Sequence, residues 1–231
     1  MATQVVNKCI EALGRIRAGI QLLVEDDISF DAFCFMNRSM ILQRNIMNFS
    51  KKHGAGIECA FRDFVDPRNS SNNFGWRPFQ IAFILMNLKG IVDPEHDNRE
   101  VVDLLYFPTG GGKTEAYLGL MAFVIANRRL RTNESDEYNR DGGVTAILRY
   151  TLRLLTTQQR DRITKMILAA ELIRQKEYPK YGKRTHQIGF WVGGTVTPNT
   201  FKELEEDPED LAKTRTARSK KKLYLQTAAY M

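Results

Sequence analysis

The sequence has few of the residues that hold small proteins together through covalent bonds or metals. Its three cysteines, Cys9, Cys34 and Cys59, are odd in number and form no C-x-x-C pair. This argues against a disulfide framework and against a zinc ribbon. The three histidines are scattered without the H-E-x-x-H spacing of a zinc enzyme. We therefore expect no metal site of the Cys/His type, and we interpret the cysteines as small buried apolar side chains.

Long apolar runs are also missing. No stretch approaches the roughly 18 residues that a membrane span needs, and Met1–Ile10 lacks the basic-then-apolar order of a signal peptide. These features predict a soluble, cytoplasmic protein without a membrane partner. The 34 basic residues exceed the 27 acidic ones, for a net charge of +7. This excess mildly favours a polyanionic partner such as nucleic acid, although many basic proteins bind none.

The pattern of apolar residues predicts two regions and a tail. Residues 1–65 contain two amphipathic helices, one over residues 8–24 and one from a Ser29 cap to about Ser50. A polar, turn-rich break at residues 66–75 precedes the second region, 66–200. Residues 201–231 hold an acidic block beside a basic block, which is typical of a solvated, flexible tail; the other interpretation is a loop that contacts nucleic acid.

The second region alternates between predicted strands and helices. The expected strands are Val101–Tyr106, Val144–Leu148 and Ile188–Val192, and the expected helices are Pro78–Leu88, Thr114–Asn127 and Thr157–Lys176. Alternating strands and helices indicate a parallel sheet covered by helices. The predicted fold class is therefore α/β, with a helical amino-terminal segment before a parallel-sheet domain.

A glycine-rich loop lies between the first expected strand and the helix after it. Phe107–Thr114 reads F-P-T-G-G-G-K-T, which matches the phosphate-binding pattern G-x-x-x-x-G-K-[ST] except at Phe107. Glycines allow successive backbone N–H groups to point at phosphate oxygens. Lys113 would reach the β- and γ-phosphates of ATP, and the Thr114 hydroxyl would bind Mg²⁺. The residues expected to bind ATP in and beside this loop are Thr109, Gly110, Gly111, Gly112, Lys113, Thr114 and Glu115, with Lys113 and Thr114 as catalytic residues.

Together with its flanking motifs, the loop resembles superfamily 2 helicases. The upstream R-P-F-Q string, which ends at Gln80, looks like the adenine-sensing element of that family. The Gln80 amide offers the donors and acceptor that adenine requires. The other interpretation of Gln80 is an ordinary exposed helix residue. The resemblance implies a partial RecA-like ATP-binding domain over residues 66–200.

R-Y-T-L-R-L-L-T-T-Q-Q at residues 149–159 stands where this family has a nucleic-acid-contacting motif. Its hydroxyl, amide and guanidinium groups suit phosphate contacts, although Thr156 or Thr157 could instead simply cap a helix. Three stretches of sequence are similar to DISARM phage-defence helicases of the DrmA type: the loop, this string, and I-G-F-W-V-G-G-T at 188–195. That resemblance implies a DNA partner and a companion defence protein. The residues it places against nucleic acid are Arg149, Thr151, Arg153, Thr156, Gln158, Gly193 and Gly194.

Two parts of such a motor are not found in these 231 residues. No Asp-Glu pair follows an apolar strand after residue 160, and no second RecA-like domain with arginine fingers is present. We therefore expect an amino-terminal portion of a larger helicase that hydrolyses little ATP alone. Two alternatives stay open: a truncated nucleic-acid- or partner-binding module, and a small P-loop phosphotransferase.

Overall fold

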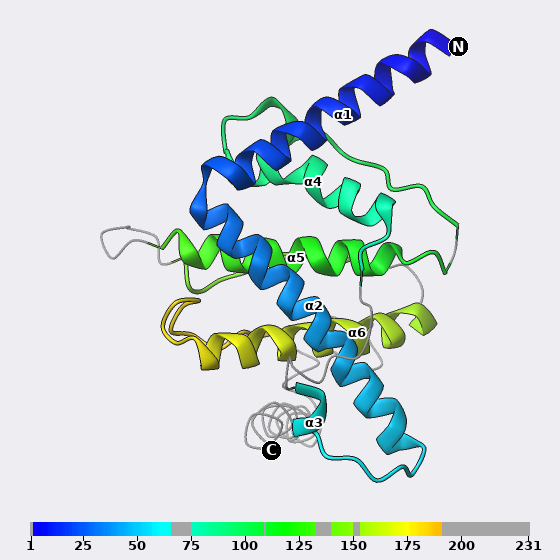
Figure 1. Cartoon of the computed structure of the whole chain (residues 1–231), viewed down its shortest axis with the longest axis vertical. Helices are drawn as coiled ribbons and strands as arrows, with labels where there is room; N and C mark the ends of the chain where they lie inside the picture. The colour runs from blue at the N-terminus through cyan, green and yellow to red at the C-terminus, as the bar shows by residue number, and fades with distance from the viewer. Residues whose placement is uncertain (1, 66–74, 109, 133–139, 150–152, 191–231) are drawn as a thin grey trace, which may run out of the picture. The chain divides into compact units, whose positions relative to one another are not determined.

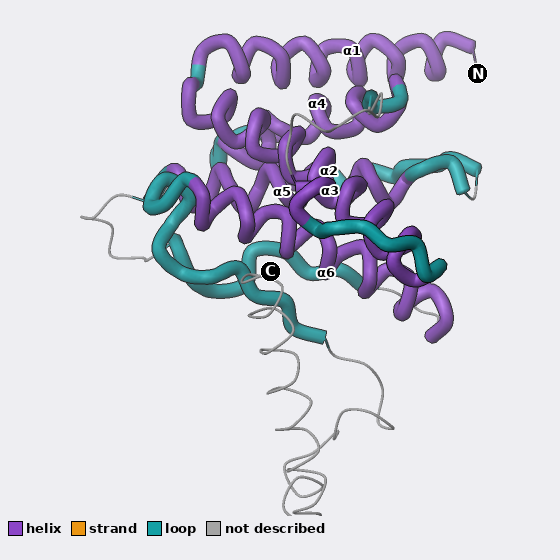
Figure 2. Tube along the Cα trace, turned by 60° about the horizontal axis from the view of Figure 1, so that its bottom comes forward, coloured by secondary structure: helices purple, strands orange, loops and turns teal. Residues whose placement is uncertain are grey.

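The computed structural model describes residues 2–65, 75–108, 110–132, 140–149 and 153–190, and within these ranges the chain is helical. Figures 1 and 2 show a set of packed helices joined by loops. In chain order the elements are α1 (Ala2–Glu25), α2 (Asp27–Gly54), α3 (Arg62–Val65), α4 (Pro78–Val92), the 3₁₀ helix η2 (Asp97–Glu100), α5 (Lys113–Leu130) and α6 (Arg153–Lys176). They belong to one compact unit, Met1–His186.

Helix α2 carries the centre of the core, because it packs against both α5 and α6 (Figure 1). The side chain of Asp26 caps its first turn by accepting a hydrogen bond from the Ile28 N–H at 3.3 Å. Ser29, which we predicted as the cap, instead donates its hydroxyl to Asp26 at 2.6 Å. Apolar side chains from the three helices are buried together: Phe35, Met36 and Met40 of α2, Leu118 and Phe123 of α5, and Met166 of α6.

Helix α1 packs on α4. The helix itself is confirmed. Of the apolar residues whose spacing predicted it, Ile10, Leu13 and Ile20 are 62%, 46% and 48% exposed, whereas Ile16 and Leu23 are half-buried. The face that meets α4 contains Gly19, where an added Cβ would lie 2.0 Å from the main-chain oxygen of Leu85. The absence of a side chain at Gly19 therefore allows the backbones of α1 and α4 to approach closely, and Leu22 of α1 is buried as well.

The predicted α/β fold class is wrong for the described residues. Residues 101–106, 144–148 and 188–190 form neither strands nor a sheet, so no RecA-like parallel sheet is present in the described ranges (Figure 2). A strand exists only when a neighbouring strand completes its hydrogen bonds. Apolar side chains of the expected strands are instead left in solvent, with Val102 94%, Leu104 87%, Tyr106 91% and Ile147 85% exposed.

One polar contact holds the first of these segments against the helices. Arg15 of α1 donates two hydrogen bonds to the Asp103 carboxylate, at 2.7 and 2.5 Å. The two side chains are 9% and 16% exposed. A two-bond pair of this kind fixes the orientation of both partners. It therefore places the segment that leads into the glycine-rich loop beside α1.

A cluster of buried charged groups lies near the end of α6. Glu171 accepts two hydrogen bonds from the Arg174 guanidinium, at 2.8 and 2.6 Å, and one from the His186 N–H at 3.0 Å. The His186 Nδ1 atom lies 3.2 Å from the same carboxylate, and the three side chains are 4–8% exposed. The cluster joins the last turns of α6 to His186, in the segment that follows the helix.

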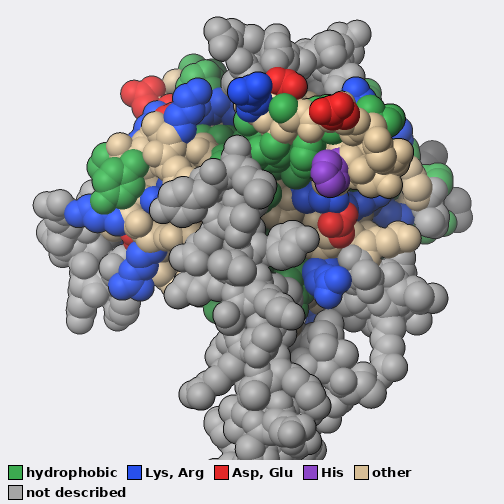
Figure 3. Space-filling model, turned by 90° about the horizontal axis from the view of Figure 1, so that it is seen from below, with side chains coloured by type: hydrophobic (Ala, Val, Ile, Leu, Met, Phe, Trp, Pro, Cys, Tyr) green, Lys and Arg blue, Asp and Glu red, His purple; other side chains and the backbone are tan. Residues whose placement is uncertain are grey.

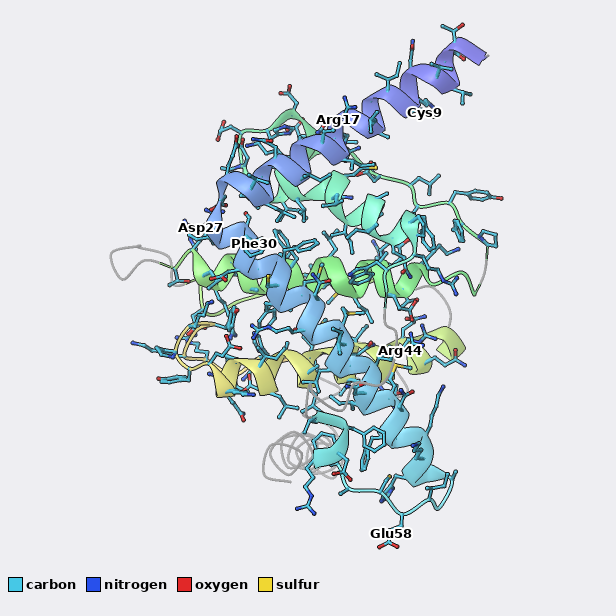
Figure 4. The ribbon with its side chains drawn as sticks, viewed as in Figure 1. Cys9, Arg17, Asp27, Phe30, Arg44 and Glu58 are labelled. Atoms are coloured by element: carbon cyan, nitrogen blue, oxygen red, sulfur yellow. The ribbon has the colours of Figure 1, made fainter. Side chains whose placement is uncertain are left out.

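The described residues hold no helix that is both long enough and apolar enough to cross a membrane. Nor do they contain a group of His, Cys, Asp or Glu side chains that could hold a metal ion. The prediction that all three cysteines are buried is wrong, because Cys9 is exposed on the first half of α1 (Figure 4), whereas Cys34 and Cys59 are partly buried. All three are free thiols.

Candidate phosphate-binding site

The glycine-rich loop leads directly into the first turn of α5. Gly112 caps this helix with φ = +94°, and Gly110 has φ = +80°. Both angles lie in the left-handed region, which disfavours residues with a Cβ. At Gly111 an added Cβ would lie 2.4 Å from the Phe107 ring. The local conformation therefore favours glycine at these three positions. The N–H groups of the first turn of α5, which have no partner within the helix, lie at the positive end of the helix dipole.

Gln80 braces the loop from α4, where its side chain is only 5% exposed. The Oε1 atom accepts a hydrogen bond from the Arg77 N–H at 2.8 Å, and Nε2 donates to the Gly112 carbonyl at 2.8 Å. The interpretation of Gln80 as an ordinary exposed helix residue is therefore wrong. Its amide connects the N-terminal turns of two helices, and adenine recognition stays a prediction.

Two further contacts join the start of α4 to the same loop. Arg77 donates to the Gly111 carbonyl at 2.7 Å. The ring of Phe79 stacks on Phe107, with ring centres 3.9 Å apart and planes 14° apart. Phe107 occupies the position where the phosphate-binding pattern has its first glycine. The stack explains why an aromatic residue is tolerated there: its ring packs against Phe79 of α4.

The residues expected to contact the nucleotide lie around this loop. Lys113 is half-buried and donates its ammonium to the Phe107 carbonyl. Thr114 is half-buried in the first turn of α5. The side chain of Glu115 accepts a hydrogen bond from Arg162 of α6 at 2.8 Å. Thr109 lies outside the described residues.

Most of the predicted nucleic-acid contacts cannot be placed in this site. Arg149 and Gln158 are described, and both are exposed. Thr151, Gly193 and Gly194, and the side chains of Arg153 and Thr156, fall outside the described part. The same is true of the charged tail. Helix α6 begins at Arg153, so the interpretation of Thr156 or Thr157 as its cap is wrong. In the face drawn in Figure 3, the visible Lys and Arg side chains are spread among neutral and apolar ones.

Sequence reasoning missed Arg162, which contacts the first turn of α5. The pair that it forms with Glu115 joins positions 47 residues apart in the chain. No local pattern predicts such a pair. Helix α6 contains several arginines, and the sequence does not show which of them reaches α5. The one available signal was Glu115 itself, an acidic residue at a loop expected to bind an anion.

Two glycine substitutions separate backbone strain from steric clash in the loop. Gly110→Ala is expected to lower the free energy of unfolding by about 1 kcal/mol, since a Cβ there meets only the left-handed penalty. Gly112→Ala is expected to cost about 2 kcal/mol, because its Cβ would also lie 2.7 Å from Gln80 Nε2. Urea denaturation of both variants measures the difference. Equal losses would show that Gln80 does not brace the loop.

Comparison with known proteins adds one relative. No family model matches the chain. The chain is 48% identical over 206 residues to the DISARM protein DrmA of Bacillus paralicheniformis. The matched part is 88% of this chain and 18% of that relative, so the chain spans less than a fifth of the protein that it matches. This identity over most of its length shows that the chain is homologous to a segment of a DISARM protein DrmA.

Proposed function

We propose that this chain is the ATP-binding part of a DISARM defence protein that acts on DNA. The observation that carries the proposal is the braced glycine-rich loop at the start of α5. Two glycines with positive φ precede the helix, and successive N–H groups at such a turn attract anions. Gln80 and Arg77 hold the loop through the carbonyls of Gly112 and Gly111. The Gly111 N–H donates to the Pro108 carbonyl at 3.1 Å, so the N–H groups proposed to meet the phosphates are those of the first turn of α5, which have no partner within the helix.

The residues of the loop fit a nucleotide triphosphate with its Mg²⁺. Lys113 would exchange its bond to the Phe107 carbonyl for a bond to the β- and γ-phosphates, as a mobile point charge. The Thr114 hydroxyl would hold Mg²⁺, which neutralises charge on the transferred phosphoryl group. The remaining N–H and lone pair of the Gln80 amide would meet the adenine base. Phosphoryl transfer depends mostly on such positioning and charge stabilisation.

Homology to a DISARM protein supports a role in defence against phage, and a companion protein of the same system is the proposed partner. DNA is the proposed substrate. Arg149 and Gln158 are exposed on either side of the start of α6, where a guanidinium and an amide suit backbone phosphates. The matched DrmA protein is much longer than this chain. A protein of that length would couple ATP binding at this loop to helicase or translocase activity.

Lys113→Ala is expected to weaken binding of Mg·ATP by roughly 10- to 100-fold, since the lysine supplies a charge-assisted hydrogen bond to the phosphates. Isothermal titration calorimetry on the full 231-residue chain measures this. Lys51→Ala is the matched control, because Lys51 is an exposed lysine in the last turn of α2 and takes no part in the contacts described for the loop. Equal affinity of the two variants would refute nucleotide binding at this loop.

The same variants distinguish the motor from a simple binding module. A DNA gel shift that persists unchanged in Lys113→Ala, in a chain that binds no Mg·ATP, would favour a nucleic-acid-binding module. The net charge of +7 is what keeps that second candidate open.

A further inference from the structure

A carboxylate lies beside the glycine-rich loop and is held there by α6. Glu115 follows Thr114 in the first turn of α5, and its Oε1 atom accepts a hydrogen bond from Arg162 Nη1 at 2.8 Å. The two side chains are 28% and 35% exposed. This contact brings a residue of α6 to the start of the helix that the loop precedes.

The second oxygen of Glu115 is directed toward the loop. A Cβ built on Gly112 would lie 3.5 Å from Glu115 Oε2. The same oxygen is buried and has no hydrogen-bond partner among the described residues. The carboxylate therefore approaches the loop with one oxygen neutralised by Arg162 and the other unpaired.

The main chain at Arg162 is itself anchored in the core. Gln43 of α2 donates its side-chain N–H to the Arg162 carbonyl at 3.3 Å, and Gln43 is 3% exposed. Helix α2 also packs along α5. The guanidinium thus extends from a fixed turn of α6 toward a fixed turn of α5.

Glu115 and a bound phosphate would occupy the same electrostatic region. Both are attracted to the positive end of α5, and two negative groups close together repel one another unless a cation lies between or beside them. From this geometry we propose that Arg162 is a positioning residue of the nucleotide site: it neutralises Glu115 and holds its carboxylate off the phosphates. The inference rests on the proposed function, since it concerns the affinity of the same loop.

Arg162→Ala is expected to weaken Mg·ATP binding by roughly three- to tenfold, because the carboxylate is then left uncompensated beside the phosphates. The double variant Glu115→Gln/Arg162→Ala is expected to return to within about twofold of the native affinity, since no charge is left to neutralise. Raising the salt concentration should shrink the loss in the single variant. A purely structural role for Arg162 predicts no recovery in the double variant and no effect of salt.

The matched control is Lys165→Ala, which removes a positive charge and an ion pair from the same helix. Lys165 bonds Asp161 at 2.6 Å within α6, and its loss is expected to change the affinity less than twofold. Circular dichroism tests whether each variant is folded. If Arg162→Ala does not fold, Arg162→Gln replaces it, since glutamine removes the charge but keeps a hydrogen-bond donor.

The outcomes separate this inference from the proposed function. A native chain that binds no Mg·ATP, or binds it as well with Lys113→Ala, overturns the proposed function and this inference with it. If the native chain binds and Lys113→Ala does not, an Arg162→Ala affinity equal to that of Lys165→Ala overturns the inference alone. A double variant that stays as weak as Arg162→Ala also overturns it.

Discussion

Glu171→Ala is expected to lower the free energy of unfolding by about 3–5 kcal/mol, the range found when one partner of a buried ion pair is removed. The substitution would leave the Arg174 guanidinium, whose side chain is 7% exposed, without its two carboxylate bonds. It would also leave the His186 N–H without its acceptor. Urea denaturation followed by circular dichroism gives the change directly.

Glu25→Ala serves as the control for this substitution. Glu25 is exposed at the end of α1, and its contact with Gln21 is an exposed pair. Its loss is expected to stay within about 0.5 kcal/mol of the native protein. A Glu171→Ala variant as stable as Glu25→Ala would mean that the buried cluster contributes nothing to stability.

The same cluster should make the protein sensitive to acid. Burial opposes ionisation of Glu171, but the hydrogen bonds from Arg174 and His186 outweigh it and hold its pKa well below the ordinary 4.5. Burial lowers the pKa of His186 below 6.5, against the opposing effect of Glu171. For both groups the unfolded chain binds more protons than the folded one below the ordinary pKa. Stability should therefore fall as the pH drops below about 6.5 and again below about 4.5. The second fall should be smaller in Glu171→Ala, although Asp26 still contributes to it. Burial raises the pKa of Asp26, but its bonds to Ser29 and Arg131 outweigh burial and hold that pKa below the ordinary value.

Gly19→Ala is expected to destabilise the protein by about 3 kcal/mol or more. The added Cβ would lie 2.0 Å from the Leu85 oxygen and 2.9 Å from its carbonyl carbon. Both are main-chain atoms, which a side-chain rotation cannot move, so α1 and α4 must separate. Thermal and urea unfolding measure the loss.

Gly14→Ala, on the same helix, should have the opposite sign. A Cβ at Gly14 meets nothing within 4 Å, and replacing an exposed glycine inside a helix by alanine stabilises by roughly 0.5–1 kcal/mol. The two variants differ only in whether the glycine faces α4. If both substitutions stabilise the protein, Gly19 does not lie against the backbone of α4.

Helices were the predictable part of this fold, because their signals are local. The proline of R-P-F-Q and the apolar run after it predicted a helix over Pro78–Leu88, and α4 covers Pro78–Val92. The run after the glycine-rich loop predicted Thr114–Asn127, and α5 covers Lys113–Leu130. The contacts that a helix makes were less predictable: Gly19 of α1 meets the backbone of α4, a contact with no local signature.

Strands were not predictable in the same way. An apolar run such as Val101–Tyr106 indicates a strand only on the assumption that partners lie on both sides. The described residues supply none, and the Arg15–Asp103 pair holds the segment instead. For the site, the motif identified the loop and its glycines, because each glycine serves a local turn. Arg162 could not be found, because its role depends on how α6 packs.

The two bonds that hold Gln80 also decide which way round its amide lies. Rotating the amide by 180° would set Oε1 against the Gly112 carbonyl and Nε2 against the Arg77 N–H, and both contacts would become repulsive. The one N–H and one lone pair left over are therefore presented in a single order. A purine held there would satisfy this order with the amino group and N7 of adenine, whereas the keto oxygen of guanine would oppose the amide oxygen. A preference for ATP over GTP would then follow from the Arg77 N–H and the Gly112 carbonyl, which orient the Gln80 amide without contacting the base.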